Sequence, residues 1–376
     1  MPSDFRQIYD DFPIKRQFVY LNNASIGALS TKVVGAVTRF LEDVRDHGRL
    51  HYPDWCQYAD TTIKERVSEL IGADKSEIAF VKNTTEGILI VANGLDWRPG
   101  DNVVIADIEY PSNVYCWMNL ARRGVSIKWV KAREGRILLE DIDALIDRRT
   151  RVVSLSAVQF SNGFRLDLER LGALCQSRGV LLNLDAIQWV GALHLDLRRC
   201  HVDFLSFGGH KWLLAPIGTG IFYCRKDSMQ HIHPHNVGYH SVDKSEDHMD
   251  YDLTFRPNAG RFEEALVNFP GIWGLEAAVE LHLALGAENE ERYILGLYAV
   301  AKRGLEAKGY QIVSPQGEGE VSGILSFRHP TLQPERIADR LQAAKINLAI
   351  RGGNLRISPS VYNDEAEIRR LLEALP

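Results

Sequence analysis

One stretch of the chain, from Val180 to Cys224, constrains the fold more than any other. It contains three short apolar runs separated by residues typical of turns, at positions 180–184, 203–207 and 220–224. Such runs predict neighbouring strands of a buried sheet. Asp185 ends the first run, and Gly208-Gly209-His210-Lys211 follows the second. Because α/β proteins place ligands at strand ends, the stretch predicts a binding site.

The polar residues of this stretch suit one chemistry, the binding of an aldehyde cofactor as a Schiff base. A lysine must lose its proton to attack an aldehyde, and burial of Lys211, beside His210, would lower its pKa. Asp185 suits the acid that keeps a pyridine nitrogen protonated, and Gln188 is placed to hydrogen-bond the ring oxygen. Each feature alone has an ordinary alternative, a helix cap or a surface turn, but their combination favours the cofactor site.

A second motif predicts an anion site. Residues 78–81 are a predicted strand, Asn83-Thr84-Thr85-Glu86-Gly87 follows as a turn, and an apolar helix begins next. The free N–H groups and the dipole of a helix N-terminus bind anions, and two hydroxyls join them here. We therefore expect Thr84 and Thr85 to hold a cofactor phosphate. A capping box starting at Asn83 or Thr84 is the structural alternative, and the two interpretations are compatible.

These motifs resemble the class V aminotransferase family of fold-type I pyridoxal-phosphate (PLP) enzymes, which includes cysteine desulfurases, selenocysteine lyases and isopenicillin N epimerases. The segments that carry the resemblance occur in the family's order and span nearly the whole chain: 83–87, Asp185-x-x-Gln188, Gly209-His210-Lys211 with Pro216-x-Gly218-x-Gly220, and Arg356-Ile357-Ser358 before Tyr362-Asn363. The match is specific for fold and cofactor, and less so for the reaction. It implies PLP bound covalently to Lys211, with cofactor contacts from Thr84, Thr85, Tyr110, Asp185, Gln188 and His210.

The resemblance also implies a substrate site. Arg356 matches the family's clamp for the substrate α-carboxylate, a task that suits a planar, bidentate guanidinium, and Arg351 is its reserve. A surface ion pair is the alternative, which we favour for Arg351 and not for Arg356. Asn23 and Ala24 lie in the loop whose backbone groups approach that carboxylate in relatives; for them a plain turn is an equal alternative.

The chain departs from the family's pattern at several positions. The desulfurases stack a histidine on the cofactor ring where this chain has Tyr110, which stacks equally well but lacks an imidazole for proton transfer; packing at the rim is the alternative. Many relatives carry an asparagine where this chain has Phe160, with Gln159 or Asn162 as substitutes. A threonine that reaches the partner's phosphate is absent near Leu266 and Val267, and Gly208 replaces a serine.

Composition bounds the remaining classes of function. The 376 residues are 45% hydrophobic and 25% charged, which fits a large core and two domains. A net charge of −5 without a basic run argues against nucleic acid and anionic membranes as partners. The polar N-terminus is unlike a signal peptide, and no apolar run approaches the roughly 20 residues of a membrane span. Five scattered cysteines fit a reducing cytoplasm.

Four histidines lie at positions 231, 233, 235 and 240. The spacing by two of the first three could present metal ligands on one face of a strand. Pro234 interrupts such a strand, and no cysteine or carboxylate motif accompanies the histidines. We therefore expect no metal site, and instead a loop at the substrate site or at a dimer interface. Relatives contribute to each other's active sites as homodimers, so the resemblance implies a homodimer.

Strands that alternate with helices from residue 78 to 207 predict βαβ crossovers and an α/β fold. We expect the fold-type I architecture, a mainly parallel seven-stranded sheet sandwiched by helices. Residues 220–224 follow too closely for a crossover helix and should run antiparallel. The break at Pro270-Gly271 divides a large PLP-binding domain with an N-terminal arm, residues 1–270, from a smaller C-terminal α+β domain, residues 271–376.

The reaction is less constrained than the cofactor. With an amino acid bound as external aldimine, the freed Lys211 is the natural base for the α-proton, and the α-carbanion leads to β-elimination, transamination or epimerisation. Persulfide-forming desulfurases carry a nucleophilic cysteine before the substrate arginine, and this chain has no cysteine after Cys224. A β-eliminating C–S lyase is the first expectation, and an aminotransferase or epimerase is the alternative. A non-catalytic PLP-binding module ranks below both, because Lys211 and Asp185 are present.

Overall fold

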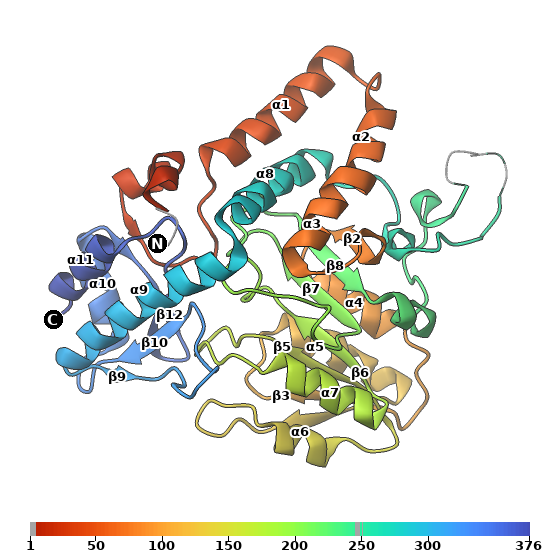
Figure 1. Cartoon of the computed structure of the whole chain (residues 1–376). Coiled ribbons are helices and arrows are strands. Elements are labelled where there is room, and N and C mark those ends of the chain that lie inside the picture. The colour runs from red at the N-terminus through yellow and green to blue at the C-terminus, as the bar shows by residue number, and fades with distance from the viewer. Residues whose placement is uncertain (1–4, 245–248, 250) are drawn as a thin grey trace.

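A computed structural model describes residues 5–244, 249 and 251–376 of the chain. Its centre is a seven-stranded sheet in the order β2-β8-β7-β6-β5-β3-β4 (Figure 1). The strands are β2 (Ile78–Val81), β3 (Asn102–Ala106), β4 (Ser126–Val130), β5 (Thr150–Ser156), β6 (Leu181–Asp185), β7 (Phe204–Gly208) and β8 (Gly220–Cys224). As predicted for residues 220–224, β8 runs antiparallel to both of its neighbours, whereas the pairs from β7 to β4 are parallel.

The strands at the centre of the sheet are mostly apolar on both faces because helices cover both faces of the sheet. Ile78 and Phe80 of β2 belong to one hydrophobic cluster, and Ala79 and Val81 belong to a second cluster on the opposite face. The covering helices are α3 (Lys64–Ile71), α4 (Thr84–Gly94), α5 (Ser112–Met118), α6 (Leu139–Leu145), α7 (Leu168–Arg178) and α8 (Phe269–Leu285). The expected mainly parallel sheet between helices is therefore confirmed.

The C-terminal part has its own small sheet and its own core. Four strands in the order β12-β13-β10-β9 form this sheet, and a third hydrophobic cluster lies behind it. The elements are α9 (Ala287–Ala307), β9 (Gln311–Ile312), β10 (Leu325–Arg328), α10 (Pro334–Ala343), β11 (Ile346–Asn347), β12 (Ala349–Arg351), β13 (Asn354–Ile357) and α11 (Glu365–Ala374). A division near residue 270 stays a prediction.

The N-terminal segment packs on this C-terminal part. It consists of η1 (Phe5–Asp11), η2 (Pro13–Arg16) and β1 (Val19–Tyr20), and β1 pairs in parallel with β11. Figure 1 shows the segment beside α9 and α11, near the C-terminus. Phe5 stacks on Tyr293 of α9 with ring centroids 4.2 Å apart. The two ends of the chain thus share one packed unit.

Two long helical segments connect this unit to the large sheet. Ser30 caps α1 (Thr31–His47) through its hydroxyl, which accepts from the N–H of Val33, and α1 packs along α8. The second segment, α2 (Tyr52–Tyr58), continues through a π-helical turn, η3 (Ala59–Ile63), into α3. The remaining short helices are η4 (Lys75–Glu77), η5 (Asn119–Arg123), η6 (Lys226–His231), η7 (Tyr239–Ser241) and η8 (Ala259–Phe262). Within the described ranges, no helix is both long and apolar enough to cross a bilayer.

A buried ion pair joins α3, β2 and the segment after η8, and it yields a stability prediction. Lys64 Nζ lies 2.9 Å from Glu263 and 2.7 Å from Asp60, and Glu263 also accepts from the N–H of Phe80. Lys64→Met leaves the Glu263 carboxylate buried without this cation, so we expect a loss of about 3–5 kcal/mol in the free energy of unfolding. Denaturant unfolding measures it.

The matched control is Lys75→Met, which breaks an exposed ion pair with Glu65. The control should change the free energy of unfolding by less than about 1 kcal/mol. Equal effects of the two substitutions would contradict the assignment of the buried pair as a stability determinant.

Candidate active site

The candidate active site lies where parallel strands end at one edge of the large sheet. Asp185 is the last residue of β6, in register with Ser156 of β5 and Ser206 of β7. Lys211 follows β7 by three residues, in a turn closed by hydrogen bonds from Leu214 N to Lys211 O and from Ala215 N to Gly209 O. The sheet therefore brings the predicted acid and the predicted amine to the same edge, as the strand-end argument expected.

Burial sets the charge of Lys211. Its side chain is 9% exposed, and Nζ lies 5.4 Å from the centroid of the Tyr110 ring. Burial lowers the lysine pKa to about 8; Asp185 opposes this shift, and Arg356 and Arg351 add to it. About a tenth of the amine is then neutral at pH 7, compared with less than about a thousandth for an exposed lysine. The amine is thus suited to attack an aldehyde.

Burial acts on Asp185 in the opposite direction. The carboxyl is 2% exposed, and one of its oxygens accepts from the N–H of Ile187 at 3.0 Å. Burial raises the pKa of Asp185 to about 7; Glu109 adds to the shift, while Lys211 and the Ile187 N–H oppose it. A protonated ring nitrogen would supply the charge that this site lacks, so the carboxyl fits the predicted partner of a pyridinium.

Glu109 forms a polar network that the sequence analysis missed. Its buried carboxylate accepts from Ser156 N at 2.9 Å, from Gln159 Nε2 at 2.8 Å and from Asn113 Nδ2 at 3.1 Å, and it also bonds the Ser156 hydroxyl. Burial raises the pKa of Glu109, against these hydrogen bonds. These hydrogen bonds connect the loop after β3 to the loop after β5 and fix both. Gln159 Oε1, in the second loop, is buried without a hydrogen-bond partner. The position of Glu109 directly before Tyr110 was the available signal.

The predicted anion site forms at the N-terminus of α4. Asn83 is the N-cap, because its side-chain oxygen accepts from Glu86 N at 2.9 Å. The Glu86 carboxylate accepts from Lys82 N and not from Asn83 N, so the structure shows the N-cap without the reciprocal bond of a capping box. Thr84 Oγ1 accepts from Gly208 N at 2.9 Å, and Thr85 Oγ1 donates to Ser112 Oγ at 2.8 Å. Ser112, at the start of α5, is a third hydroxyl that the sequence analysis did not select. The cluster suits a phosphate.

Gln188 and His210 frame the lysine turn. Gln188 Nε2 donates to Ala24 O at 3.0 Å, and Gln188 Oε1 accepts from Trp212 Nε1 at 2.8 Å. One N–H of the amide remains for another acceptor. The backbone carbonyl of His210 accepts from Gly27 N at 2.8 Å, and burial followed by Lys211 lowers the pKa of the His210 imidazole. The neutral imidazole side chain lies beside Gly208, where a Cβ would come 3.0 Å from Nδ1.

Tyr110 and Phe160 form an aromatic wall at the site. Their rings meet edge to face with centroids 5.2 Å apart, and the Tyr110 side chain is 44% exposed. An exposed aromatic face near Lys211 suits stacking on a flat cofactor ring. The structure thus brings Tyr110, Lys211 and Asp185 into one neighbourhood.

Arg356 is buried and lacks an anionic partner. It is 1% exposed, and Nη1 donates to Phe160 O at 2.6 Å while Nη2 donates to Ser25 Oγ at 2.8 Å. Its Nε is buried without a hydrogen-bond partner, and none of the described acidic residues forms an ion pair with it. Burial, followed by Arg351, lowers the pKa of Arg356 to about 9. A buried guanidinium whose Nε has no hydrogen-bond partner is suited to bind a carboxylate.

Arg351 lies close by, on the neighbouring strand. Its Nη2 is 3.4 Å from the same Ser25 hydroxyl, and its Nη1 donates to Ile350 O. Ser25 therefore joins both guanidinium groups, a role that the sequence analysis did not assign. Asn23 and Ala24 precede it, but their polar groups contact the segment after β13: Asn23 Nδ2 donates to Ser358 O, and Ala24 N donates to Ser358 Oγ.

The histidines between His231 and His240 do not form a ligand cluster among the described residues. The group of donor atoms that does come together comprises Asp43, His47 and His51. Both imidazole Nδ1 atoms lie 2.8 Å from the same Asp43 oxygen, and Trp55 Nε1 donates to the other oxygen. These hydrogen bonds explain why the side chains of Asp43, His47 and His51 lie together.

Comparisons with known proteins agree with this geometry. A family model described as aminotransferase class V matches residues 19–371. A protein named probable cysteine desulfurase from Methanothermobacter thermautotrophicus is 33% identical over 97% of this chain and 96% of that protein. A cysteine desulfurase of Cronobacter sakazakii is 28% identical over 100% of this chain and 98% of that protein.

Solved structures are similar over the same length. The complex between the cystine C–S lyase C-DES and its reaction product cysteine persulfide has a TM-score of 0.88 and 26% identity, covering 96% of this chain and 98% of that one. The cysteine desulfurase of Thermococcus onnurineus NA1 has a TM-score of 0.89 at 24% identity, covering 98% and 96%. The chain therefore belongs to the aminotransferase class V family. The expected family, fold type and PLP dependence are confirmed.

The residues present fit this cofactor. The buried amine of Lys211, the buried carboxyl of Asp185 and the hydroxyl cluster at the start of α4 offer the three kinds of group that PLP requires, for its aldehyde, its ring nitrogen and its phosphate. When bound, PLP supplies an electron sink for the α-carbon of an amino acid.

The raised pKa of Asp185 yields a prediction about the cofactor-free protein. The carboxyl titrates near pH 4 when unfolded and near pH 7 when folded, so folding favours its protonated form and stability falls as pH rises from 4 to 7. Asp185→Asn keeps the acceptor for Ile187 N but carries no charge. It should stabilise the cofactor-free protein by about 4 kcal/mol at pH 8, with the gain shrinking towards pH 4.

Denaturant unfolding of the cofactor-free variant at several pH values measures this gain. Asp339→Asn, at an exposed position of α10, is the matched control and should show no such pH-dependent gain. A pH-independent effect of Asp185→Asn would contradict the raised pKa.

Proposed function

We propose that the protein is a PLP-dependent C–S lyase that eliminates a sulfur group from the β-carbon of an amino acid. Lys211 takes the α-proton, Asp185 holds the ring nitrogen, and Thr84 and Thr85 hold the phosphate. Tyr110 stacks on the ring, with Gln188 and His210 beside it. Arg356 binds the substrate α-carboxylate, with Asn23 and Ala24 in the adjoining loop.

One observation carries the choice of elimination over sulfur transfer. The hairpin that bears the substrate arginine closes with Gly352-Gly353, at φ of +55° and +73°, so β12 and β13 join without room for a cysteine loop. The buried thiols are also unsuited to attack sulfur, since burial raises the pKa of Cys116 to about 12. The sulfur fragment then leaves with both electrons of the broken Cβ–S bond, as a thiolate or a persulfide.

The similar proteins support the same proposal. Those named above are cysteine desulfurases or a cystine C–S lyase, and all of these names describe cleavage of a C–S bond. Transamination or epimerisation is the second candidate, because it starts from the same α-proton removal by Lys211.

Product analysis of the PLP-loaded protein tests the reaction. With cystine or an S-substituted cysteine, we expect pyruvate and the sulfur product in equal amounts, without added thiol, and no product from Lys211→Ala. Alanine formed together with a thiol-dependent sulfur transfer, an α-keto acid that retains the side chain, or racemised substrate would contradict elimination.

The same assay tests the carboxylate clamp. Arg356→Gln removes a charge-assisted, bidentate contact, so KM should rise about 30- to 100-fold with the products unchanged. Arg369→Gln, which breaks an exposed ion pair with Glu365, is the matched control and should leave KM unchanged. An unchanged KM in Arg356→Gln would contradict the clamp.

We propose a homodimer with a cytoplasmic location. Exposed apolar side chains line the outer face of α1, at Val34, Leu41 and Val44, and Tyr251 and Leu253 are 91% and 67% exposed. Figure 1 shows α1 on the outer side of α8, away from the large sheet. Apolar surface of this kind marks protein interfaces. The buried cysteines Cys116, Cys175, Cys200 and Cys224 are free thiols, which supports a reducing compartment.

Sedimentation tests the dimer. The protein should sediment at twice its chain mass of 42.4 kDa, and Leu41→Glu should shift it towards the monomer. Leu332→Glu, at a half-exposed position remote from α1, should leave the mass unchanged. A monomeric wild-type protein at micromolar concentration would contradict the proposal.

A further inference from the structure

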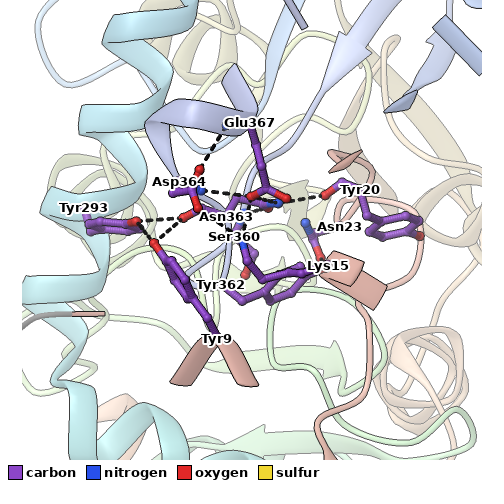
Figure 2. Close-up of polar contacts among 10 residues, drawn as sticks. All are labelled: Tyr9, Lys15, Tyr20, Asn23, Tyr293, Ser360, Tyr362, Asn363, Asp364 and Glu367. Atoms are coloured by element: carbon purple, nitrogen blue, oxygen red, sulfur yellow. Dashed lines mark hydrogen bonds and ion pairs between the residues drawn. The ribbon is translucent and has the colours of Figure 1, made fainter. Parts of the chain in front are cut away.

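Tyr362 and Asn363 form a motif to which neither the cofactor site nor the carboxylate site assigns a role. They follow Arg356 by six and seven residues, and both are fully buried. Figure 2 shows them within a polar network that reaches from η1 and β1 to α9 and α11. Hydrogen bonds in a buried network strengthen one another in the low dielectric of the interior, so each contact constrains its neighbours.

Tyr362 fixes the orientation of Asn23. Its phenol donates to Asn23 Oδ1 at 2.6 Å, and its ring stacks on Phe12 with centroids 4.4 Å apart. Burial raises the pKa of Tyr362, so the phenol keeps its proton and remains a donor. Asn23 Oδ1 is therefore the acceptor, and the opposite end of the amide, Nδ2, must point the other way.

That opposite end attaches the loop to the strand of the substrate arginine. Asn23 Nδ2 donates to Ser358 O at 2.9 Å, and Ala24 N donates to Ser358 Oγ at 2.9 Å. Ser358 lies two residues after Arg356 and bridges in parallel to Asn22. The loop of residues 22–27 thus has a fixed place relative to β13.

The same loop contacts both halves of the active site. Ser25 Oγ accepts from Arg356 Nη2 at 2.8 Å, and Gly27 N donates to His210 O at 2.8 Å. A Cβ on Gly27 would lie 2.0 Å from Lys211 O, so the loop and the lysine turn touch without spare room. A shift of the loop would therefore move Ser25 away from Arg356.

Asn363 secures the other side of the network. Its Oδ1 accepts from Ser360 N at 2.8 Å, and its Nδ2 donates to Tyr20 O at 3.1 Å. Its backbone carbonyl accepts from the Tyr293 phenol at 2.7 Å (Figure 2). Asn363 thus holds the backbone around Tyr362 against β1 and α9, which leaves the phenol a single fixed position.

We propose that Tyr362 is a positioning residue for substrate binding: through Asn23 it sets the 22–27 loop, and through Ser25 it sets the Arg356 guanidinium that receives the substrate carboxylate. This inference rests on the carboxylate role proposed for Arg356. Tyr362 touches neither the substrate nor the cofactor. Its loss should therefore weaken carboxylate binding and leave the cofactor and the proton transfer at Lys211 unchanged.

Tyr362→Phe in the PLP-loaded protein tests the proposal. We expect KM for the amino acid to rise about 10-fold, kcat to stay within about 3-fold, and the absorption band of the bound cofactor to keep its position. Propionate, a carboxylate without an amino group, should bind the variant about 10-fold more weakly in calorimetry, a measurement that needs no turnover.

Tyr298→Phe is the matched control, because this buried phenol accepts a hydrogen bond from Gln316 Nε2 at 2.5 Å elsewhere in the C-terminal part. It should lower the thermal stability comparably and leave KM and propionate affinity unchanged. If Tyr362→Phe does not fold, Ser358→Ala removes the acceptor of Ala24 N in the same loop and should raise KM in the same way. Unchanged KM and propionate affinity in the folded variant would overturn the proposal.

Arg356→Gln, measured in parallel, separates the two possible failures. If Arg356→Gln leaves KM unchanged, the carboxylate clamp is wrong and the positioning role falls with it. If Arg356→Gln raises KM and Tyr362→Phe does not, the clamp stands and the positioning role alone is overturned.

Discussion

The structure depends on one constraint, the removal of a lysine amine and a carboxyl from water at the ends of two strands of a rigid sheet. Burial lowers the pKa of Lys211 to about 8 and raises that of Asp185 to about 7. Burial thus disfavours the charged form of both groups near neutral pH. A cofactor with an aldehyde and a basic ring nitrogen relieves both costs at once. Cofactor binding is therefore coupled to folding stability, because it removes the desolvation penalty that the fold imposes. Asp185 lies in register between Ser156 and Ser206 on the neighbouring strands, so the sheet holds the Asp185 carboxyl in its buried position.

The substrate half of the site belongs to a different packed unit from the cofactor half. Arg356 lies on β13 of the small sheet, whereas Lys211 follows β7 of the large sheet. The loop of residues 22–27 contacts both, and its own place is set by β1, which pairs with β11, and by the segment after β13. The first residues of the chain and the last hundred therefore determine together where the Arg356 guanidinium lies relative to the Lys211 amine. This arrangement explains why polar residues far from the chemistry, such as Asn363, are fully buried and fully hydrogen-bonded.

The sequence predicted the strand ends well and the contacts between distant loops poorly. A strand buried on both faces, such as β3 or β8, is apolar along its length, so its bounds are visible in composition, and Asp185 and Lys211 follow from their places at strand ends. Ser25 was missed because its partner Arg356 lies 331 positions away, and a loop serine has no periodicity to mark it. Ser112 and Glu109 were missed for the same reason, since their partners lie 27 to 50 positions along the chain. The pairing of β1 with β11 involves two residues on each strand, too few for a recognisable pattern.

The geometry also limits where the protons of an elimination can go. Tyr110 has no imidazole, and burial raises the pKa of the Cys116 and Cys175 thiols, so neither kind of group is a ready acid or nucleophile for a departing sulfur. Lys211 lies near the aromatic wall, with Nζ 5.4 Å from the Tyr110 ring centroid, and burial lowers its pKa to about 8. An amine that has taken the α-proton is at that moment an ammonium, and a pKa of about 8 makes it an effective acid as well as an effective base. In the proposed elimination the same nitrogen returns the proton to the leaving sulfur, which makes a separate acid at position 110 unnecessary.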